Sequence, residues 1–267
     1  MSSSTYSQQS RCKLSSRVES AHHEQYAVIG YPSRLVGRKQ VAEGTMAFRF
    51  ERPRNFLFKA GQFVDLAPRG ARPDGSDGLT HTFSIASSPV AEEIVVATRM
   101  RDTAFKRALS ILAIGVEVRI KGPMGSFTLH KNVSRPAVFL AGGIGIAPFL
   151  SMLFYAREQK LRHPIVLFYA NRYLEDAAFI DELWKLERAD PRFRFVPILT
   201  RMANNDGGWK GKTGHISAEM LLTQVGVVRG PIYYVAGPPT MVAAARQTLS
   251  EVGVDEDDIR TEEFSGY

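Results

Sequence analysis

Residues 137–148 read AVFLAGGIGIAP, an apolar run that passes into a glycine-rich turn and ends on a proline. The first five residues have the length and composition of a buried strand, and the residues from Ile146 onward are typical of a helix. Glycines in such a turn let the backbone approach a phosphate closely, and a helix N-terminus adds free N–H groups. Close packing of strand against helix is the alternative explanation of the same glycines, but the position of the turn after the first strand of the alternating half favours phosphate binding.

The segments around this turn alternate between strand and helix patterns. The predicted strands are residues 137–141, 165–170, 193–200, 232–236 and 259–264, and the predicted helices are residues 147–158, 176–188, 218–224 and 239–252. Alternation of this kind builds a parallel, doubly wound sheet with right-handed crossovers. Such sheets bind ligands at the carboxyl ends of their strands.

The preceding half of the chain has a different rhythm, with short strands separated by turns that carry Gly and Pro. The predicted strands are residues 27–36, 44–51, 62–66, 82–86, 94–100 and 117–121, interrupted by one helix at residues 103–112. Six strands at this spacing favour a closed antiparallel barrel. The polar segment KNVSRP, residues 131–136, is the predicted linker between the halves.

Three further segments contain residue types that suit ligand binding, and each also has a purely structural explanation. Residues 236–241, AGPPTM, repeat the strand–turn–helix arrangement, which an ordinary connector also explains. Residues 81–84, HTFS, combine hydroxyl and aromatic side chains on a predicted strand. Residues 99–109, RMRDTAFKRAL, place cations and a capping Thr at a helix start, which suits a phosphate or a solvated basic helix.

Composition excludes several classes of protein. The single cysteine, Cys12, cannot form an intrachain disulfide or supply a four-cysteine metal cluster, and the six histidines show no metal-binding spacing. Residues 136–156 are uncharged over a membrane-spanning length, but their central glycines and proline favour a strand–turn–helix unit, so we expect no membrane segment. The Ser-rich residues 1–25 have no apolar run of a secretory signal and are predicted to be a disordered tail of a cytoplasmic protein.

Positive charge is concentrated in the first half of the chain. The sequence has 34 Lys and Arg against 27 Asp and Glu. Residues 31–72 alone hold nine cations, at Arg34, Arg38, Lys39, Arg49, Arg52, Arg54, Lys59, Arg69 and Arg72, against three acids. A basic face of this kind steers an acidic protein partner, or serves only solubility. We do not expect nucleic-acid binding.

Taken in order, these segments resemble the ferredoxin–NADP⁺ reductase-like superfamily of FAD-binding NAD(P)H oxidoreductases, without an iron–sulfur domain. The resemblance covers residues 26–267 and rests on HTFS (81–84), KGPMGSFTL (121–129), AGGIGIAPFLSML (141–153), YYVAGPPTM (233–241) and EEFSGY (262–267). It implies an antiparallel β-barrel flavin domain over residues 26–130. An α/β doubly wound parallel-sheet nucleotide domain would follow over residues 136–267.

On the flavin side, the family motif Arg-x-Tyr-Ser or -Thr reads His81-Thr82-Phe83-Ser84 here. The resemblance makes Ser84 the hydroxyl beside the flavin N5 atom and Phe83 a ring that packs against the flavin. His81 replaces the arginine that meets the FAD phosphates, and a free His is mostly neutral at pH 7. Arg99, Arg101, Lys106 and the helix start at Thr103 are the expected substitutes, and FMN stays open beside FAD.

On the nucleotide side, the resemblance assigns the pyrophosphate and nicotinamide region to Gly142, Gly143, Gly145 and Pro148. Gly237, Pro238 and Met241 match the Cys-Gly-x-Pro-x-Met signature, with Ala236 in place of the cysteine. Arg172 and Arg201 match positions that contact the 2′-phosphate in NADP-using relatives. We therefore expect NADPH, with NADH as the alternative, for which these arginines are merely solvated.

The C-terminal EEFSGY resembles the family ending of a Glu followed by an aromatic residue. Phe264 or Tyr267 is the expected ring on the flavin face, and Glu263, or Glu262, the expected acid beside N5. The resemblance implies a reductase that passes hydride from NAD(P)H to FAD, and then electrons to a separate acidic redox protein such as ferredoxin or flavodoxin. A free-flavin or ferric-complex reductase, and a non-catalytic flavin- and nucleotide-binding subunit, are the alternatives.

Overall fold

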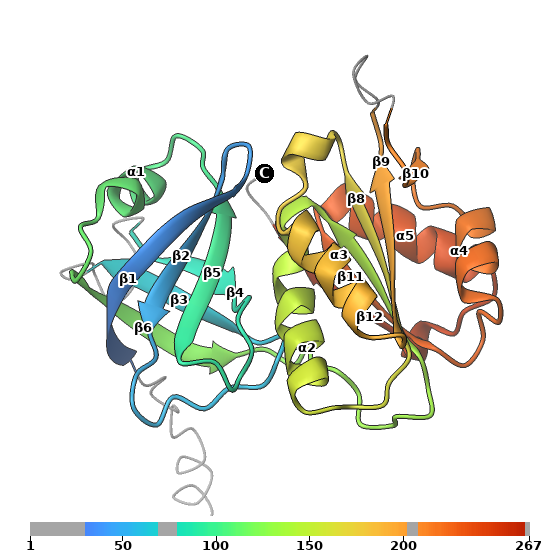
Figure 1. Cartoon of the computed structure of the whole chain (residues 1–267), viewed down its shortest axis with the longest axis horizontal. Coiled ribbons are helices and arrows are strands. Elements are labelled where there is room, and N and C mark those ends of the chain that lie inside the picture. The colour runs from blue at the N-terminus through green and yellow to red at the C-terminus, as the bar shows by residue number, and fades with distance from the viewer. Residues whose placement is uncertain (1–29, 69–78, 202–207, 265–267) are drawn as a thin grey trace, which may run out of the picture.

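The computed structural model describes residues 30–68, 79–201 and 208–264, so the predicted tail at residues 1–25 lies outside the described residues. Two six-stranded sheets follow one another along the chain, the first antiparallel and the second parallel (Figure 1). This confirms the predicted order of fold classes.

The first sheet curls around an aromatic-rich core. Its strands are β1 (Gly30–Ala42), β2 (Thr45–Glu51), β3 (Phe63–Pro68), β4 (His81–Ser84), β5 (Glu93–Arg99) and β6 (Glu117–Met124), paired in the order β4-β3-β6-β1-β2-β5. At the end of β2, buried Phe48 and Phe50 alternate with exposed Arg49 and Glu51, as the period of a half-buried strand requires. The core contains Phe48, Phe50 and Phe56. The short helix α1 (Ala104–Ile111) buries Phe105 against the same core.

The predicted closed barrel is a half-barrel. Strands β4 and β5 are the two edges of the first sheet, and no strand ladder joins them among the described residues. They approach one another just after β4, where Ala86 N donates to Val95 O at 2.8 Å and Val95 N donates to Ser87 Oγ at 3.0 Å. Only the end of β4 is therefore tied to β5, and the rest of this strand borders open space.

The second sheet has the order β10-β9-β8-β7-β11-β12, with all neighbours parallel. Its strands are β7 (Ala137–Gly142), β8 (Ile165–Asn171), β9 (Phe193–Leu199), β10 (Lys212–Thr213), β11 (Ile232–Gly237) and β12 (Ile259–Glu263). Every residue of the central strands β7 and β11 is buried, because helices cover both faces. Their apolar sequences reflect this double burial.

The helices divide between the two faces of the second sheet (Figure 1). Those on one face are α2 (Ala147–Glu158) and α3 (Ile180–Ala189), and those on the other are α4 (Ala218–Val225) and α5 (Pro239–Glu251). The α2 face also packs against Ala60, Ala86 and Phe127 of the first half of the chain. One of the buried clusters therefore extends across the contact between the two halves.

One predicted helix start is wrong. The sequence pattern predicts a helix from Asp176, but Leu174–Asp176 form a single 3₁₀ turn and α3 begins at Ile180. Phe179, just before α3, has a left-handed backbone with φ of 60°, which interrupts any continuous helix. The two-residue strand β10 is too short to leave a sequence pattern.

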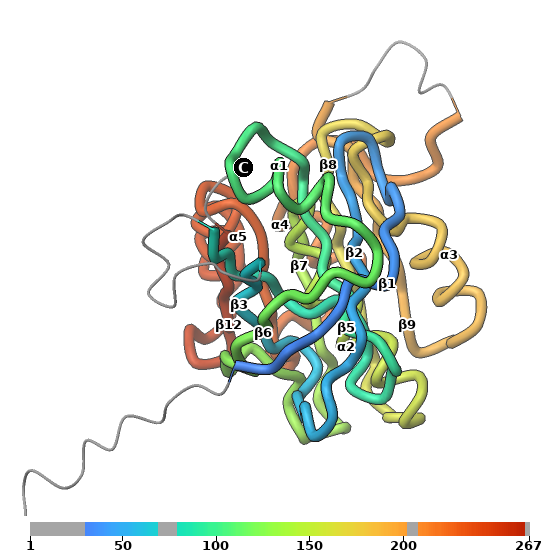
Figure 2. Tube along the Cα trace, turned by 90° about the vertical axis from the view of Figure 1, so that its left-hand side faces the viewer, coloured from blue at the N-terminus to red at the C-terminus, as the bar shows by residue number. Residues whose placement is uncertain are grey.

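The segment before α3, residues 174–179, lies against the first sheet and connects the two halves through hydrogen bonds and an ion pair (Figure 2). Glu43 N, in the turn after β1, donates to Glu175 O at 2.8 Å. The Arg99 guanidinium at the end of β5 lies 2.8 Å from the Asp176 carboxylate. This segment therefore brings the end of β5 close to the carboxyl end of β8 in the second sheet.

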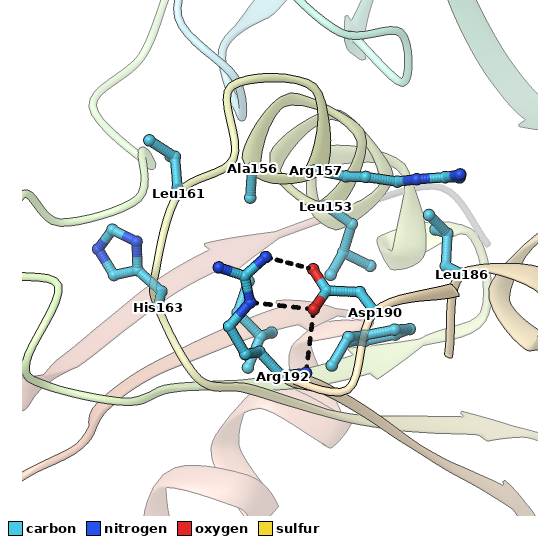
Figure 3. A pocket seen from close by; sticks show the side chains of 10 residues that line it. Leu153, Ala156, Arg157, Leu161, His163, Leu186, Asp190 and Arg192 are labelled. Atoms are coloured by element: carbon cyan, nitrogen blue, oxygen red, sulfur yellow. Dashed lines mark hydrogen bonds and ion pairs between the residues drawn. The ribbon is translucent and has the colours of Figure 1, made fainter. Parts of the chain in front are cut away.

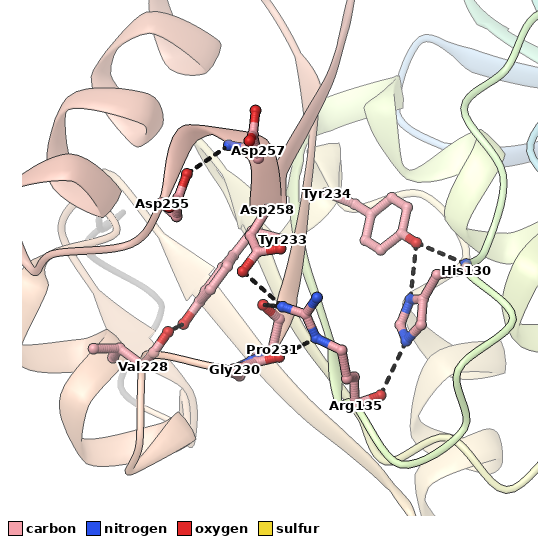
Figure 4. Close-up of polar contacts among 10 residues, drawn as sticks. All are labelled: His130, Arg135, Val228, Gly230, Pro231, Tyr233, Tyr234, Asp255, Asp257 and Asp258. Carbon is pink, nitrogen blue, oxygen red and sulfur yellow. Dashed lines mark hydrogen bonds and ion pairs between the residues drawn. The ribbon is translucent and has the colours of Figure 1, made fainter.

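Polar contacts also anchor the segment that links the two halves (Figure 4). The backbone N–H of His130 donates to the Tyr234 hydroxyl at 2.8 Å, and the His130 ring lies 3.0 Å from the same oxygen. Arg135 forms an ion pair with Asp258 at 2.6 Å. Burial lowers the pKa of His130, so the imidazole stays neutral near pH 7. Both ends of the linker are thus bonded to the second half of the chain.

Among the helices of the described ranges, none combines the length and the hydropathy that a bilayer crossing demands.

Candidate functional site

A cleft lies at the carboxyl ends of β7, β8 and β11, where a doubly wound sheet binds its ligand. Its volume is about 430 Å³, within the range of small-molecule sites. The second sheet and its loops supply most of the lining, at Gly142, Gly143, Ile144, Ala170, Asn171, Arg172, Asp176, Ala178, Thr200, His215, Ile216, Pro238, Thr240, Met241, Ala244 and Ala245. Thr45, Arg99 and Arg101 close the cleft from the first half.

The glycine-rich turn serves two purposes at once. Gly143 has φ of +53° and open space where a Cβ would stand, so its backbone faces the cleft. A Cβ on Gly145 would instead lie 2.3 Å from the carbonyl oxygen of Ala236 on β11. Gly143 therefore gives a ligand access to the backbone, whereas Gly145 is required for close packing of the turn on β11.

A second, smaller cleft of about 90 Å³ adjoins the first and shares Arg99 and Ile144 with it. Strand β4 supplies four consecutive lining residues, His81, Thr82, Phe83 and Ser84, because it is an edge strand of the half-barrel. The remaining lining residues are Ala97, Thr98, Lys106, Ala147 and Phe264. The HTFS segment, the α1 region and the C-terminal strand therefore meet in one place.

Ser84 and Glu262 join the two sheets at this smaller cleft. The Ser84 hydroxyl donates to the Glu262 carboxylate at 3.3 Å, across 178 residues of sequence. Ser84 is 4% exposed. The predicted acid Glu263 is exposed on the other side of β12, because successive residues of a strand point to opposite faces. The acid beside Ser84 is therefore Glu262, which the sequence analysis named as the alternative to Glu263.

Burial raises the pKa of Glu262 to about 7, and the hydrogen bond from Ser84 opposes that rise only in part. A carboxyl with this pKa holds a proton at mildly acidic pH and releases it near neutrality. It is thus an acid suited to exchange a proton beside Ser84, which lines the smaller cleft.

This pKa predicts a pH-dependent stability. Since the folded state binds the Glu262 proton more tightly than the unfolded state, the free energy of unfolding should fall as pH rises from about 4.5 to about 7, and then level off. Partial exposure limits the expected loss to roughly 2 kcal/mol. Urea titrations of the wild type and Glu262→Gln across this range measure it as the difference between the two proteins. A difference independent of pH would show that the folded carboxyl titrates normally.

Cations gather at the outer end of the smaller cleft. Lys106 is 8% exposed, and its ammonium donates to the Arg99 carbonyl at 2.7 Å. No salt bridge within the described ranges involves Lys106, and burial and the Arg101 charge both lower its pKa. A buried ammonium without a carboxylate is a site for an anion.

The His81 side chain does not add to this positive charge. Its ring packs 4.5 Å from the Phe105 ring, and burial and the Lys106 charge lower its pKa. It is thus neutral near pH 7 and offers no positive charge to an anion at this end, whereas Lys106 lines the same cleft. Thr103 caps α1 by accepting from Lys106 N at 3.2 Å, and it does not line either cleft.

The predicted site residues divide by location. Those that line the two clefts are His81, Thr82, Phe83, Ser84, Arg99, Gly142, Gly143, Arg172, Pro238, Met241 and Phe264. Those in the surrounding framework are Thr103, Gly145, Pro148 and Gly237, and Arg201 is exposed beside the larger cleft without lining it. Tyr267 lies outside the described residues.

Asn171 and Asp176 are among the lining residues that were not predicted from the sequence. Asn171 is the last residue of β8 and lines the larger cleft, and Asp176 pairs with Arg99 across the two halves. A polar residue directly after an apolar strand run was a usable signal for Asn171. No local pattern identifies Asp176, because its partner is 77 residues away.

A further cavity, of about 20 Å³, lies at the opposite edge of the second sheet (Figure 3). It is lined by Ile165 and Phe193, the first residues of β8 and β9, and by the Asp190–Arg192 pair. The Arg192 guanidinium lowers the pKa of Asp190, and the two side chains satisfy one another. This cavity is too small for a cofactor and lies away from the ligand-binding edge.

Comparisons with known proteins match both halves of the chain. The oxidoreductase NAD-binding domain family matches residues 139–247. Ferredoxin–NADP reductase B of Sorangium cellulosum is 30% identical over 246 residues, covering 88% of this chain and 97% of that protein. The phenol hydroxylase P5 protein of Acinetobacter pittii is 29% identical, covering 90% of this chain and 67% of that protein. The propane 2-monooxygenase reductase component of Rhodococcus jostii is 28% identical, but the chain spans only 57% of its length.

Solved structures share the fold. A ferredoxin–NADP⁺ reductase from Neisseria gonorrhoeae with bound FAD and NADP superposes with a TM-score of 0.74 at 24% identity, covering 88% of this chain and 98% of that one. The Amycolatopsis cytochrome P450 reductase GcoB gives a TM-score of 0.75 at 22% identity, covering 88% and 70%. With the near full-length match to the Sorangium reductase, the chain belongs to the ferredoxin–NADP⁺ reductase-like superfamily of NAD(P)H-dependent FAD oxidoreductases.

Proposed function

We propose that this protein takes hydride from NADPH onto FAD and delivers the electrons to a separate acidic redox protein, such as ferredoxin or flavodoxin. The observation that carries this function is the Ser84–Glu262 contact, where a strand that lines the smaller cleft meets the C-terminal strand. One cleft suits a flavin and the other a dinucleotide, and they share Arg99 and Ile144.

The residues present fit FAD. Buried Lys106 offers an ammonium without an acidic partner in the described ranges, which suits the FAD phosphates. Phe83 and Phe264 offer ring faces within the same cleft, and Ser84 offers a buried hydroxyl. Bound FAD would supply the hydride-accepting chemistry and release the electrons singly or in pairs.

The chain itself contributes positioning and proton control. The hydrogen bond to Glu262 fixes the orientation of the Ser84 hydroxyl, whose oxygen can still accept a hydrogen bond from a flavin. Glu262 exchanges a proton with the cleft near neutral pH because its pKa is about 7. Phe264 lines the smaller cleft, and its N–H donates to Gly237 O at 3.0 Å, which supports the proposal that its ring covers the flavin face that NADPH must reach. These contacts order the reacting groups before hydride moves.

The preference for NADPH rests on Arg172. It lines the larger cleft together with Thr200 and His215, where the 2′-phosphate of NADPH needs a cation. Arg172→Ala should weaken NADP⁺ binding by about 30-fold and NAD⁺ binding by less than about threefold. Titration of both nucleotides by difference spectroscopy measures this. Arg201→Ala, outside the cleft lining, is the matched control with a smaller effect, and equal losses for both nucleotides in Arg172→Ala would remove the preference.

The acidic acceptor is supported by the charge of the first half. Arg34 and Arg38 donate to backbone carbonyls of residues 110–115, so neither charge is neutralised by these bonds. A surface that keeps its positive charge attracts an acidic protein over long range and raises the encounter rate. The relatives named as reductase components of oxygenases make an oxygenase component a second candidate acceptor.

Acceptor kinetics test this part of the proposal. With an acidic ferredoxin, turnover should be saturable, and its second-order rate constant should fall about tenfold when ionic strength rises from roughly 0.05 to 0.5 M. Free riboflavin is neutral and serves as the control, with turnover insensitive to salt. Equal rates with riboflavin, ferric chelates and ferredoxin would favour a free-flavin or ferric-complex reductase instead.

A further inference from the structure

One acid lines the larger cleft, although the ligand proposed for this cleft is an anion. Among the described lining residues, Asp176 carries a negative charge, whereas Arg99, Arg101 and Arg172 carry positive charges. The Asp176 side chain is 11% exposed, so water screens its charge only in part. An unpaired carboxylate in this place would repel the phosphates of a dinucleotide. The acid is therefore compatible with the ligand only if a cation of the protein matches its charge.

Arg99 supplies that cation from the other half of the chain. Its Nη2 atom donates to Asp176 Oδ1 at 2.8 Å, and this is the one bond that the guanidinium makes to a described residue. A guanidinium has five N–H donors, so four are left for other acceptors. Arg99 lines both clefts, and its side chain is 43% exposed. It can therefore bind Asp176 and a ligand phosphate at the same time.

The backbone on each side of this ion pair is held in place by hydrogen bonds. Arg99 ends β5, and its carbonyl accepts from the Lys106 ammonium at 2.7 Å. Asp176 ends the 3₁₀ turn whose Glu175 carbonyl accepts from Glu43 N of the first half at 2.8 Å. A free Arg side chain loses rotamer freedom when it binds a ligand, and a bond that already orders the side chain lowers this cost. The ion pair therefore prepares Arg99 for an anion.

Resting on the proposed function, we propose that Asp176 is a positioning residue, which holds the Arg99 guanidinium where the two clefts adjoin and orders its remaining donors for the phosphates of the bound dinucleotide. Asp176 acts through Arg99 and needs no contact of its own with the ligand. The ion pair cancels most of the repulsion that the carboxylate would exert on the phosphates. Asp176 therefore raises nucleotide affinity, although its own charge opposes an anion. Because the pair joins the two halves, this affinity also depends on their contact.

Calorimetric titration of NADP⁺ into the FAD-loaded protein tests this by the sign of the effect. In the wild-type background, Asp176→Asn should weaken NADP⁺ binding about fivefold, because Arg99 loses its charged partner. In the Arg99→Ala background, the same substitution should strengthen NADP⁺ binding about threefold, because the unpaired carboxylate then only repels the phosphates. Arg99→Met, which keeps the apolar stem of the side chain, is the second background if Arg99→Ala does not fold.

Glu93→Gln is the matched control for the loss of a carboxylate. Glu93 lies on the same strand, β5, and pairs with Arg49 at 3.2 Å, and neither residue lines the two clefts. This variant should bind NADP⁺ as tightly as the wild type does, because the ion pair that it breaks is remote from the ligand.

The reversal of sign separates positioning from the other roles of an acid. If Asp176 acted by repulsion alone, Asp176→Asn would strengthen NADP⁺ binding in both backgrounds. If it were merely structural, the substitution would weaken binding by the same factor in both and lower the melting temperature. Either result overturns the proposal, as does unchanged affinity in Asp176→Asn alone. A wild type that binds no NADP⁺ would instead overturn the proposed nucleotide site itself.

Discussion

Ser84→Ala is expected to slow the reduction of bound flavin by NADPH about 100-fold while the flavin stays bound. The substitution removes a buried hydroxyl that contacts Glu262 at 3.3 Å and lies on the strand that lines the flavin-side cleft. The residues proposed to hold the flavin phosphates, around Lys106, are unchanged. The loss should therefore fall on the rate of hydride transfer rather than on cofactor affinity.

Stopped-flow spectroscopy under anaerobic conditions measures this rate, and the flavin-to-protein ratio after gel filtration measures retention. Ser87→Ala is the matched control, because Ser87 is also a buried serine of the same segment, but its hydroxyl accepts from Val95 N. That control should cost stability of about 1 kcal/mol and leave the rate unchanged. A wild-type rate in Ser84→Ala would show that this hydroxyl is not at the reacting atoms.

Gly145→Ala is expected to destabilise the protein by about 3 kcal/mol, or roughly 10 °C in Tm. The new Cβ would lie 2.3 Å from Ala236 O and 2.8 Å from Gly237 Cα, both backbone atoms that cannot rotate away. The glycine-rich turn would have to move off β11. Because this turn borders the larger cleft, affinity for NADP⁺ should fall as well.

Gly143→Ala separates this steric effect from loss of backbone freedom. Gly143 has φ of +53°, but a Cβ at this position would meet nothing within 4 Å, so only a conformational cost of about 1 kcal/mol is expected. Thermal unfolding of both variants measures the contrast. Similar small shifts for the two would mean that the turn is not packed on β11 as described.

The fold was largely predictable because its signals are local. Buried parallel strands such as β7 are continuous apolar runs, and the helix predicted at residues 147–158 is α2 at its observed bounds, Ala147–Glu158. The start of α3 was not predictable, since the left-handed Phe179 depends on a backbone contact with Val41 of the other sheet. Whether the two edges of the first sheet pair also depends on long-range contacts, such as the one at Ala86, which leave no local pattern.

The site was predictable as a set of segments but not as contacts. The HTFS and glycine-rich segments line the two clefts, as their residue types indicate. The choice between Glu262 and Glu263 required the strand register, since adjacent residues face opposite ways. The sequence does not distinguish a glycine whose backbone faces the cleft, such as Gly143, from one that packs against a strand, such as Gly145. Only the structure separates these roles.

The most direct test of the account is an anaerobic titration of the purified protein with NADPH, followed by its visible spectrum. We predict a yellow protein with about one FAD per chain, whose absorbance bleaches fully with about one equivalent of NADPH. Its colour should return when oxidised ferredoxin is added. A protein that binds no flavin after incubation with FAD, or a bound flavin that NADPH does not bleach, would contradict the account.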